Sequence, residues 1–133
     1  MMFNIAIFQD DRRYLLQEIK VPVAYFIGGK SDMGYPSVSL PSPLQHLPSQ
    51  LTIIQSAKDY PLLNAGLPKL RANLDTGHGG TYSATNGGKF GKAAVAYLEW
   101  QWRDNATAKA IILDPASKGS LVKDNWSVES ANW

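Results

Sequence analysis

Two side chains in the sequence could carry acid–base chemistry together. His78 lies among glycines in Thr76-Gly-His-Gly-Gly80, and Asp32 lies in Gly28-Gly-Lys-Ser-Asp-Met33. Each follows a short apolar segment, so both would leave the carboxyl ends of successive strands, where a carboxylate can orient an imidazole. His78 is then either a general base with room for a substrate or an ordinary loop histidine between turn glycines. The residue types alone leave both interpretations open.

The segments that must position these residues favour an α/β fold. Val21–Ile27 is a continuous apolar run closed by two glycines, which is typical of a strand buried on both faces of a parallel sheet. Phe3–Phe8 and Leu70–Asp75 are further candidate strands, and Asp10–Ile19 has helical spacing of its apolar residues. We therefore expect about three parallel strands with flanking helices.

The best-defined element is a long amphipathic helix over Lys89–Arg103 near the C-terminal end. At 100° per residue its charged side chains gather in a sector about 80° wide, and Trp100 lies near the border of that sector. The opposite side of this helix carries a stripe of apolar and aromatic residues, which predicts packing against the core. The stripe on the opposite side comprises Phe90, Ala94, Tyr97, Leu98 and Trp102.

Composition excludes several classes of protein. The chain has 133 residues, 44% of them hydrophobic, which suits one globular domain. A net charge of +2 argues against a nucleic-acid partner, and no apolar run is long enough to predict a membrane span. With no cysteine and two distant histidines, we expect no metal site, and the glycine clusters match neither a phosphate-binding loop nor a dinucleotide motif, so no cofactor is expected.

Three segments of the chain resemble the C-terminal part of an α/β-hydrolase, particularly a group of fungal and bacterial hydrolase-like proteins. They cover residues 22–32, 67–82 and 87–101, and the second contains Gly-His-Gly-Gly-Thr-Tyr. The resemblance implies a partial α/β-hydrolase fold, with Asp32 as the acid and His78 as the base of a Ser-Asp-His site. It also implies an esterase-like activity of the intact family on a small-molecule substrate with an ester-like bond.

The nucleophile of that family is absent from the sequence. No Gly-x-Ser-x-Gly elbow occurs in it, so we expect a truncated hydrolase fragment that is inactive alone. The alternative is a non-catalytic binding or interaction module, or a degenerate product. A fragment of this kind would expose a strand edge and could self-associate through it. The absence of cysteine and of a signal peptide leaves both the cytoplasm and secretion open.

One segment does not fit the α/β pattern. Residues 38–55 are rich in proline, serine and leucine, and we expect an irregular insertion there. They can be back-translated with the donor, branch-point and acceptor signals of a short fungal intron, so the insertion is either a translated intron or an ordinary surface loop. In this division, residues 1–113 form the hydrolase-like part. Residues 114–133 form a mostly irregular tail after a short helix over 105–113.

Overall fold

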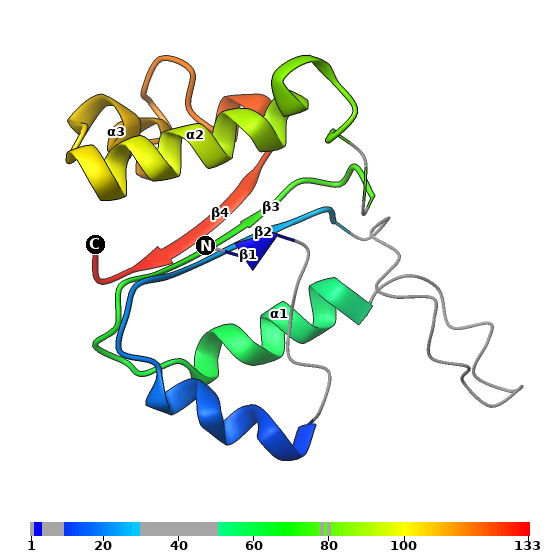
Figure 1. Cartoon of the computed structure of the whole chain (residues 1–133), viewed down its shortest axis with the longest axis vertical. Coiled ribbons are helices and arrows are strands. Elements are labelled where there is room, and N and C mark those ends of the chain that lie inside the picture. Colours follow the sequence, from blue (N-terminus) through cyan, green and yellow to red (C-terminus); the bar gives the residue numbers. More distant parts are fainter. Residues whose placement is uncertain (1, 4–9, 30–50, 78, 80) are drawn as a thin grey trace, which may run out of the picture.

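The computed structural model describes residues 2–3, 10–29, 51–77, 79 and 81–133. Within them, one sheet is covered by helices on both faces (Figure 1), so the expected α/β arrangement is confirmed. One face carries the 3₁₀ helix η1 (Asp10–Glu18) and the helix α1 (Leu51–Leu62). The other carries α2 (Gly88–Arg103) and α3 (Ala106–Leu113).

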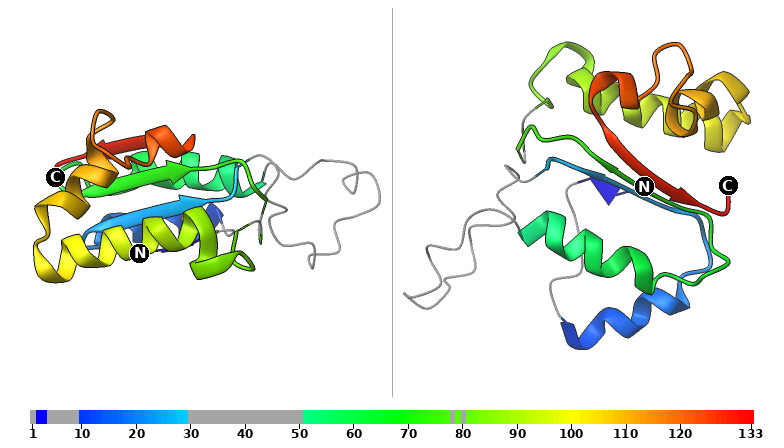
Figure 2. Two further views of the ribbon diagram at one scale, coloured as in Figure 1. Left: turned by 90° about the horizontal axis from the view of Figure 1, so that it is seen from above. Right: turned by 180° about the vertical axis from the view of Figure 1, so that it is seen from behind.

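The sheet is mixed, with the strands in the order β1-β2-β3-β4. β1 (Met2–Phe3) and β2 (Val23–Ile27) are parallel, and β2 is also parallel to β3 (Lys69–Asn73). The view from above in Figure 2 shows β2, β3 and β4 (Ser127–Ala131) side by side. β2 is fully buried along its length, which agrees with the unbroken apolar run that predicted it. Of the strand predicted over Phe3–Phe8, residues 4–9 lie outside the described residues.

β4 adds a strand within the tail 114–133, which was predicted to be mostly irregular. Ser127–Ala131 pairs antiparallel to β3, from Asn73 opposite Ser127 to Lys69 opposite Ala131. This strand escapes prediction because only its Val128 packs against the core, so its sequence lacks an apolar pattern. The two tryptophans that flank this strand hold it to α2, since Trp126 packs on Phe90 with ring centroids 4.8 Å apart and Trp133 packs on Trp100 at 4.5 Å.

The helix predicted over Lys89–Arg103 is confirmed as α2, and Phe90 and Tyr97 of its predicted apolar side are buried, but Trp102 of that side is not. Trp100 is buried, whereas Trp102 is 80% exposed. The sheet lies against the side of the helix that carries Phe90 and Trp100, and Trp102 is about 160° away from Trp100 around the helix axis. The residues of α2 that are buried are Phe90, Ala93, Ala96, Tyr97 and Trp100.

The irregular insertion predicted over 38–55 also needs correction at its end. Residues 51–55 form the first turns of α1, because no proline occurs between Leu51 and Tyr60 to stop a helix. Residues 38–50 lie outside the described residues. The short 3₁₀ helices η3 (Thr85–Gly87) and η4 (Val122–Asp124) complete the described elements. In the described part of the chain, no helix combines the length and apolar character needed to cross a membrane.

Candidate functional site

The carboxyl ends of β2 and β3 meet at one edge of the sheet. Ile27 and Asn73 are register partners at these ends, and the amide of Leu74 donates to the carbonyl of Ile27 at 2.9 Å. Beyond the strands the two loops stay in contact, since the amides of Thr76 and Gly77 both donate to the Gly28 carbonyl at 2.8 Å. In parallel sheets this is the edge at which ligands usually bind.

A close approach of the two backbones explains the glycine at position 29. Gly29 has a φ of 81°, in the left-handed region that favours glycine. A Cβ added to Gly29 would lie 2.7 Å from both Cβ and Oδ1 of Asp75, closer than real contacts allow. The Gly28-Gly29 pair therefore allows the loop after β2 to lie directly against the loop after β3.

Asp32 and His78, the two predicted site residues, lie outside the described residues. What the structure describes is the backbone that leads to each of them. Gly77, whose amide donates to the Gly28 carbonyl, immediately precedes His78 in the sequence. Gly28 itself lies four residues before Asp32. The described ends of the two loops, at Gly28 and Gly77, are thus joined by a hydrogen bond, whereas the positions of Asp32 and His78 stay a prediction.

Other polar groups gather near this edge. The side-chain oxygen of Asn73 is buried and has no hydrogen-bond partner within the described part of the chain. Thr81, which is buried beyond the glycine loop, accepts a hydrogen bond from the amide of Phe90 at 3.3 Å and so ties the loop to the first turn of α2. No group of three or more potential metal ligands occurs among the residues that the structure describes.

Sequence analysis missed a buried ionic cluster under the α1 face of the sheet. Nε of Arg13 donates to Oδ1 of Asp59 at 2.8 Å, which joins η1 to α1, and both side chains are at least nine-tenths buried. The only local indication was the spacing of Arg13 and Leu16, which puts both on one side of the helix predicted over Asp10–Ile19. Nothing local could indicate Asp59, which is 46 residues away in the chain.

The hydroxyl of Tyr25 lies beside this ion pair. Burial, and secondarily the negative charge of Asp59, raises the pKa of Tyr25 to about 12. With this pKa the hydroxyl stays protonated at neutral pH. It is buried without a hydrogen-bond partner among the described residues, so it adds no hydrogen bond to the cluster. This cluster lies under the middle of the sheet, because Tyr25 pairs with the central residue of β3, Arg71. We therefore assign it a structural role.

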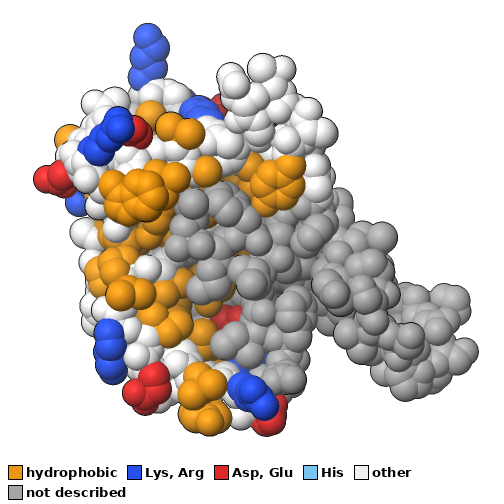
Figure 3. Space-filling model, viewed as in Figure 1, with side chains coloured by type: hydrophobic (Ala, Val, Ile, Leu, Met, Phe, Trp, Pro, Cys, Tyr) orange, Lys and Arg blue, Asp and Glu red, His pale blue; other side chains and the backbone are white. Residues whose placement is uncertain are grey.

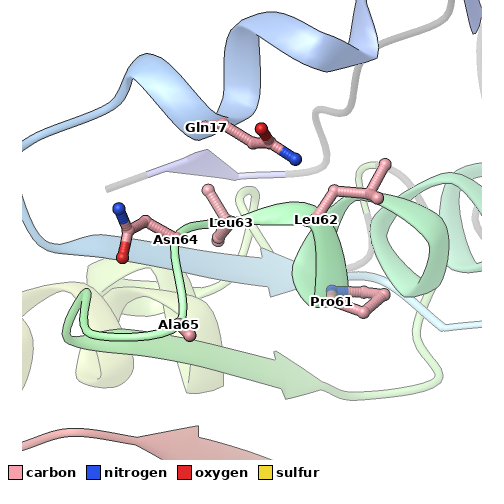
Figure 4. Close-up of a pocket in the computed structure, with 6 residues that line it drawn as sticks. All are labelled: Gln17, Pro61, Leu62, Leu63, Asn64 and Ala65. Atoms are coloured by element: carbon pink, nitrogen blue, oxygen red, sulfur yellow. The ribbon is translucent and has the colours of Figure 1, made fainter.

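A hollow of about 350 Å³ lies away from the candidate site, between the end of α1 and η1 (Figure 4). The residues that line it precede β3, so it lies toward the amino ends of the parallel strands. None of its lining side chains can titrate, so the hollow offers no acid–base chemistry. The lining residues are Gln17, Pro61, Leu62, Leu63, Asn64 and Ala65.

In comparisons with known protein families, curated proteins and solved structures, the chain has no significant match.

Proposed function

We propose that the chain is an α/β-hydrolase-like fragment that retains Asp32 and His78, the acid and histidine of a Ser-Asp-His site, and is inactive alone. The observation that carries the proposal is the junction at Gly28, whose carbonyl accepts hydrogen bonds from Thr76 and Gly77. Because this junction joins the described ends of the loops that lead to Asp32 and His78, we expect both side chains to start from neighbouring backbone.

The order of the elements supports the proposal as well. β1, β2 and β3 are adjacent in chain order and parallel, and the helical segments η1 and α1 that connect them lie on one face. α2, the helix that follows the loop of His78, covers the opposite face. A parallel sheet of this kind places the ends of its strands, and hence their loops, at a single edge.

The pair would act as it does in other Ser-Asp-His sites. The Nδ1–H group of His78 would donate a hydrogen bond to the Asp32 carboxylate. Nε2 of the same ring would then be free to take a proton from a serine hydroxyl. The sequence has no Gly-x-Ser-x-Gly segment to supply that serine or the oxyanion donors next to it. Loss of a single oxyanion donor alone costs about 10²–10³ in rate, so the pair by itself gives no useful acceleration.

A second candidate function is a non-catalytic interaction module. The specific observation in its favour is the exposed apolar side of α2, where Trp102 is 80% exposed and Val95 is 60% exposed. Figure 3 shows apolar side chains in a band that runs from the α2 layer past the sheet toward the α1 layer. A module of this kind would keep its fold and its surface while lacking any turnover.

Hydrolysis of an activated aryl ester tests whether the chain is inactive alone. We expect the purified protein and the His78→Ala variant to hydrolyse the ester at the same rate, because neither holds a nucleophile. His46→Ala, which removes the only other histidine, is the matched control for hydrolysis by an exposed imidazole. A wild-type rate at least tenfold above that of His78→Ala, with His46→Ala equal to the wild type, would contradict the proposal, because it would make the chain an enzyme on its own.

A further inference from the structure

The turn that leads into α2 exposes an asparagine that is followed by a glycine. Asn86 lies in the 3₁₀ helix η3, directly before Gly87, and it is exposed. Its side chain makes no hydrogen bond within the described part of the chain. Of the asparagines in the sequence, only Asn86 precedes a glycine. The carboxamide of Asn86 is therefore open to attack by the main-chain nitrogen of the next residue.

We propose that Asn86 is a site of spontaneous deamidation, with water as the only co-reactant. The main-chain nitrogen of Gly87 loses its proton to hydroxide and attacks Cγ of Asn86, so that an N–Cγ bond forms. The Cγ–Nδ2 bond breaks, and Nδ2 leaves as ammonia after it takes a proton from water, which regenerates the hydroxide. The product of this step is a five-membered cyclic imide.

One water molecule then opens the imide in either of two ways. Attack at Cγ breaks the new N–Cγ bond and leaves an aspartate in an unaltered main chain. Attack at the main-chain carbonyl carbon breaks the bond from that carbon to the nitrogen of Gly87, which stays attached through Cγ. This second product is an isoaspartate, with one more carbon in the main chain. Each product carries a carboxylate in place of the neutral amide and releases one proton.

The new carboxylate is compatible with the fold, because it lies directly before the amino end of α2. The first turn of this helix holds no acidic residue, and its N-cap, Gly87, makes no side-chain cap. A negative charge at this end of a helix is stabilised by the helix dipole. We therefore expect deamidation to change the charge of the turn without unfolding α2.

Glycine at position 87 makes the attack possible. It has no Cβ to obstruct the approach of its nitrogen to the side chain of Asn86. Gly87 has a φ of 73°, in the left-handed region, and no atom lies within 4 Å of the point that a Cβ would occupy. The surroundings of the turn therefore leave the reacting atoms uncrowded.

The folded turn slows the ring closure. Asn86 has a φ of 55° and a ψ of 27°, which turns the nitrogen of Gly87 away from the side chain that it attacks. The amide of Gly87 also donates to the Ala84 carbonyl at 2.8 Å. Both features must change before the ring can close. Because no residue of η3 is buried, we expect this turn to open locally at low cost in free energy.

Asn125 is the matched control within the same chain. It is also exposed, with a φ of 70° and a ψ of 23°, and the amide of the next residue likewise donates to a carbonyl, that of Leu121 at 3.0 Å. The difference is that the next residue is the buried Trp126. Peptide mapping by mass spectrometry follows both sites in the folded chain at mildly alkaline pH. We expect Asn86 to deamidate faster than Asn125 by about tenfold or more.

Two variants test the ring closure itself. Gly87→Ala keeps Asn86 but adds a Cβ next to the attacking nitrogen, so we expect deamidation to slow by about tenfold or more. Asn86→Gln should remove the isoaspartate, which isoaspartyl methyltransferase detects, because the longer side chain would have to close a larger ring. Circular dichroism shows that each variant is folded.

Three results would overturn the inference. The first is deamidation at Asn86 in the folded chain that is no faster than at Asn125. The second is loss of ammonia at Asn86 without any isoaspartate, which would mean direct hydrolysis of the side chain. The third is an equal rate in Gly87→Ala and the wild type. The inference does not rest on the proposed hydrolase site, so activity or inactivity towards an ester leaves it unchanged.

Discussion

Replacing Gly29 with alanine is expected to lower the free energy of unfolding by about 2 kcal/mol or more. Its φ of 81° is costly for any residue with a Cβ, at about 1–2 kcal/mol, and the new atom would lie 2.7 Å from Cβ and Oδ1 of Asp75. The backbone at Asp75 would have to move away, which breaks the contact between the loops after β2 and β3. Urea denaturation followed by tryptophan fluorescence measures the loss.

Gly79→Ala is the matched control for this prediction. Gly79 belongs to the glycine-rich loop after β3, against which the loop of Gly29 lies, but a Cβ added at Gly79 meets no atom within 4 Å, and its φ lies outside the left-handed region. We expect its free energy of unfolding to stay within about 0.5 kcal/mol of the wild type. Equal stability of Gly29→Ala and Gly79→Ala would mean that the close approach at Gly29 is not present in solution.

Asp59→Asn is expected to destabilise the fold by about 3–5 kcal/mol. The Asp59 side chain is fully buried against the guanidinium of Arg13, whose side chain is 9% exposed. Removing the carboxylate takes away the negative charge that lies 2.8 Å from the buried guanidinium of Arg13, and removal of one partner is the most damaging way to break such a pair. Because the pair joins η1 to α1, chemical denaturation should show the loss as a lower midpoint of the whole transition.

Two control variants distinguish the loss of the Arg13–Asp59 ion pair from a general effect of substituting polar side chains. Glu129→Gln removes a carboxylate that also pairs with an arginine, Arg71, but Glu129 is 57% exposed, so we expect a loss of at most about 1 kcal/mol. Tyr25→Phe removes a buried hydroxyl that has no partner among the described residues, so stability should be unchanged or slightly higher. If Asp59→Asn costs no more than Glu129→Gln, the buried pair is not an essential link.

Sequence patterns predicted the helices and strands that are determined by the residues of their own segment. The unbroken apolar run of β2 and the helical periodicity of α2 lie within single segments, and both elements formed where expected, as did the short helix α3. β4 could not be found in this way, because it is held by pairing with β3 and turns only Val128 toward the core. A strand of this kind is defined by its neighbour rather than by its own residues.

Long-range packing explains the remaining differences. Trp100 and Trp102 are equally apolar, and only the position of the sheet decides that Trp100 is buried and Trp102 exposed. Arg13 and Asp59 likewise meet only after β2 has brought η1 and α1 to one face. For the candidate site, residues 28–29 and 76–77 follow the ends of β2 and β3, and the contact at the Gly28 carbonyl adds that these loop segments touch; the placement of Asp32 and His78 stays a prediction.

The most direct test of the proposed site is the ¹⁵N NMR spectrum of the chain labelled at its two histidines. If Asp32 accepts a hydrogen bond from His78, the His78 ring will carry its proton on Nδ1, the tautomer that is less common for a free imidazole. We expect this tautomer in the wild-type protein, its loss in Asp32→Asn, and its retention in His46→Gln, which also assigns the signal. A His78 ring protonated on Nε2 in the wild type and unchanged in Asp32→Asn would contradict the pairing on which the proposed function depends.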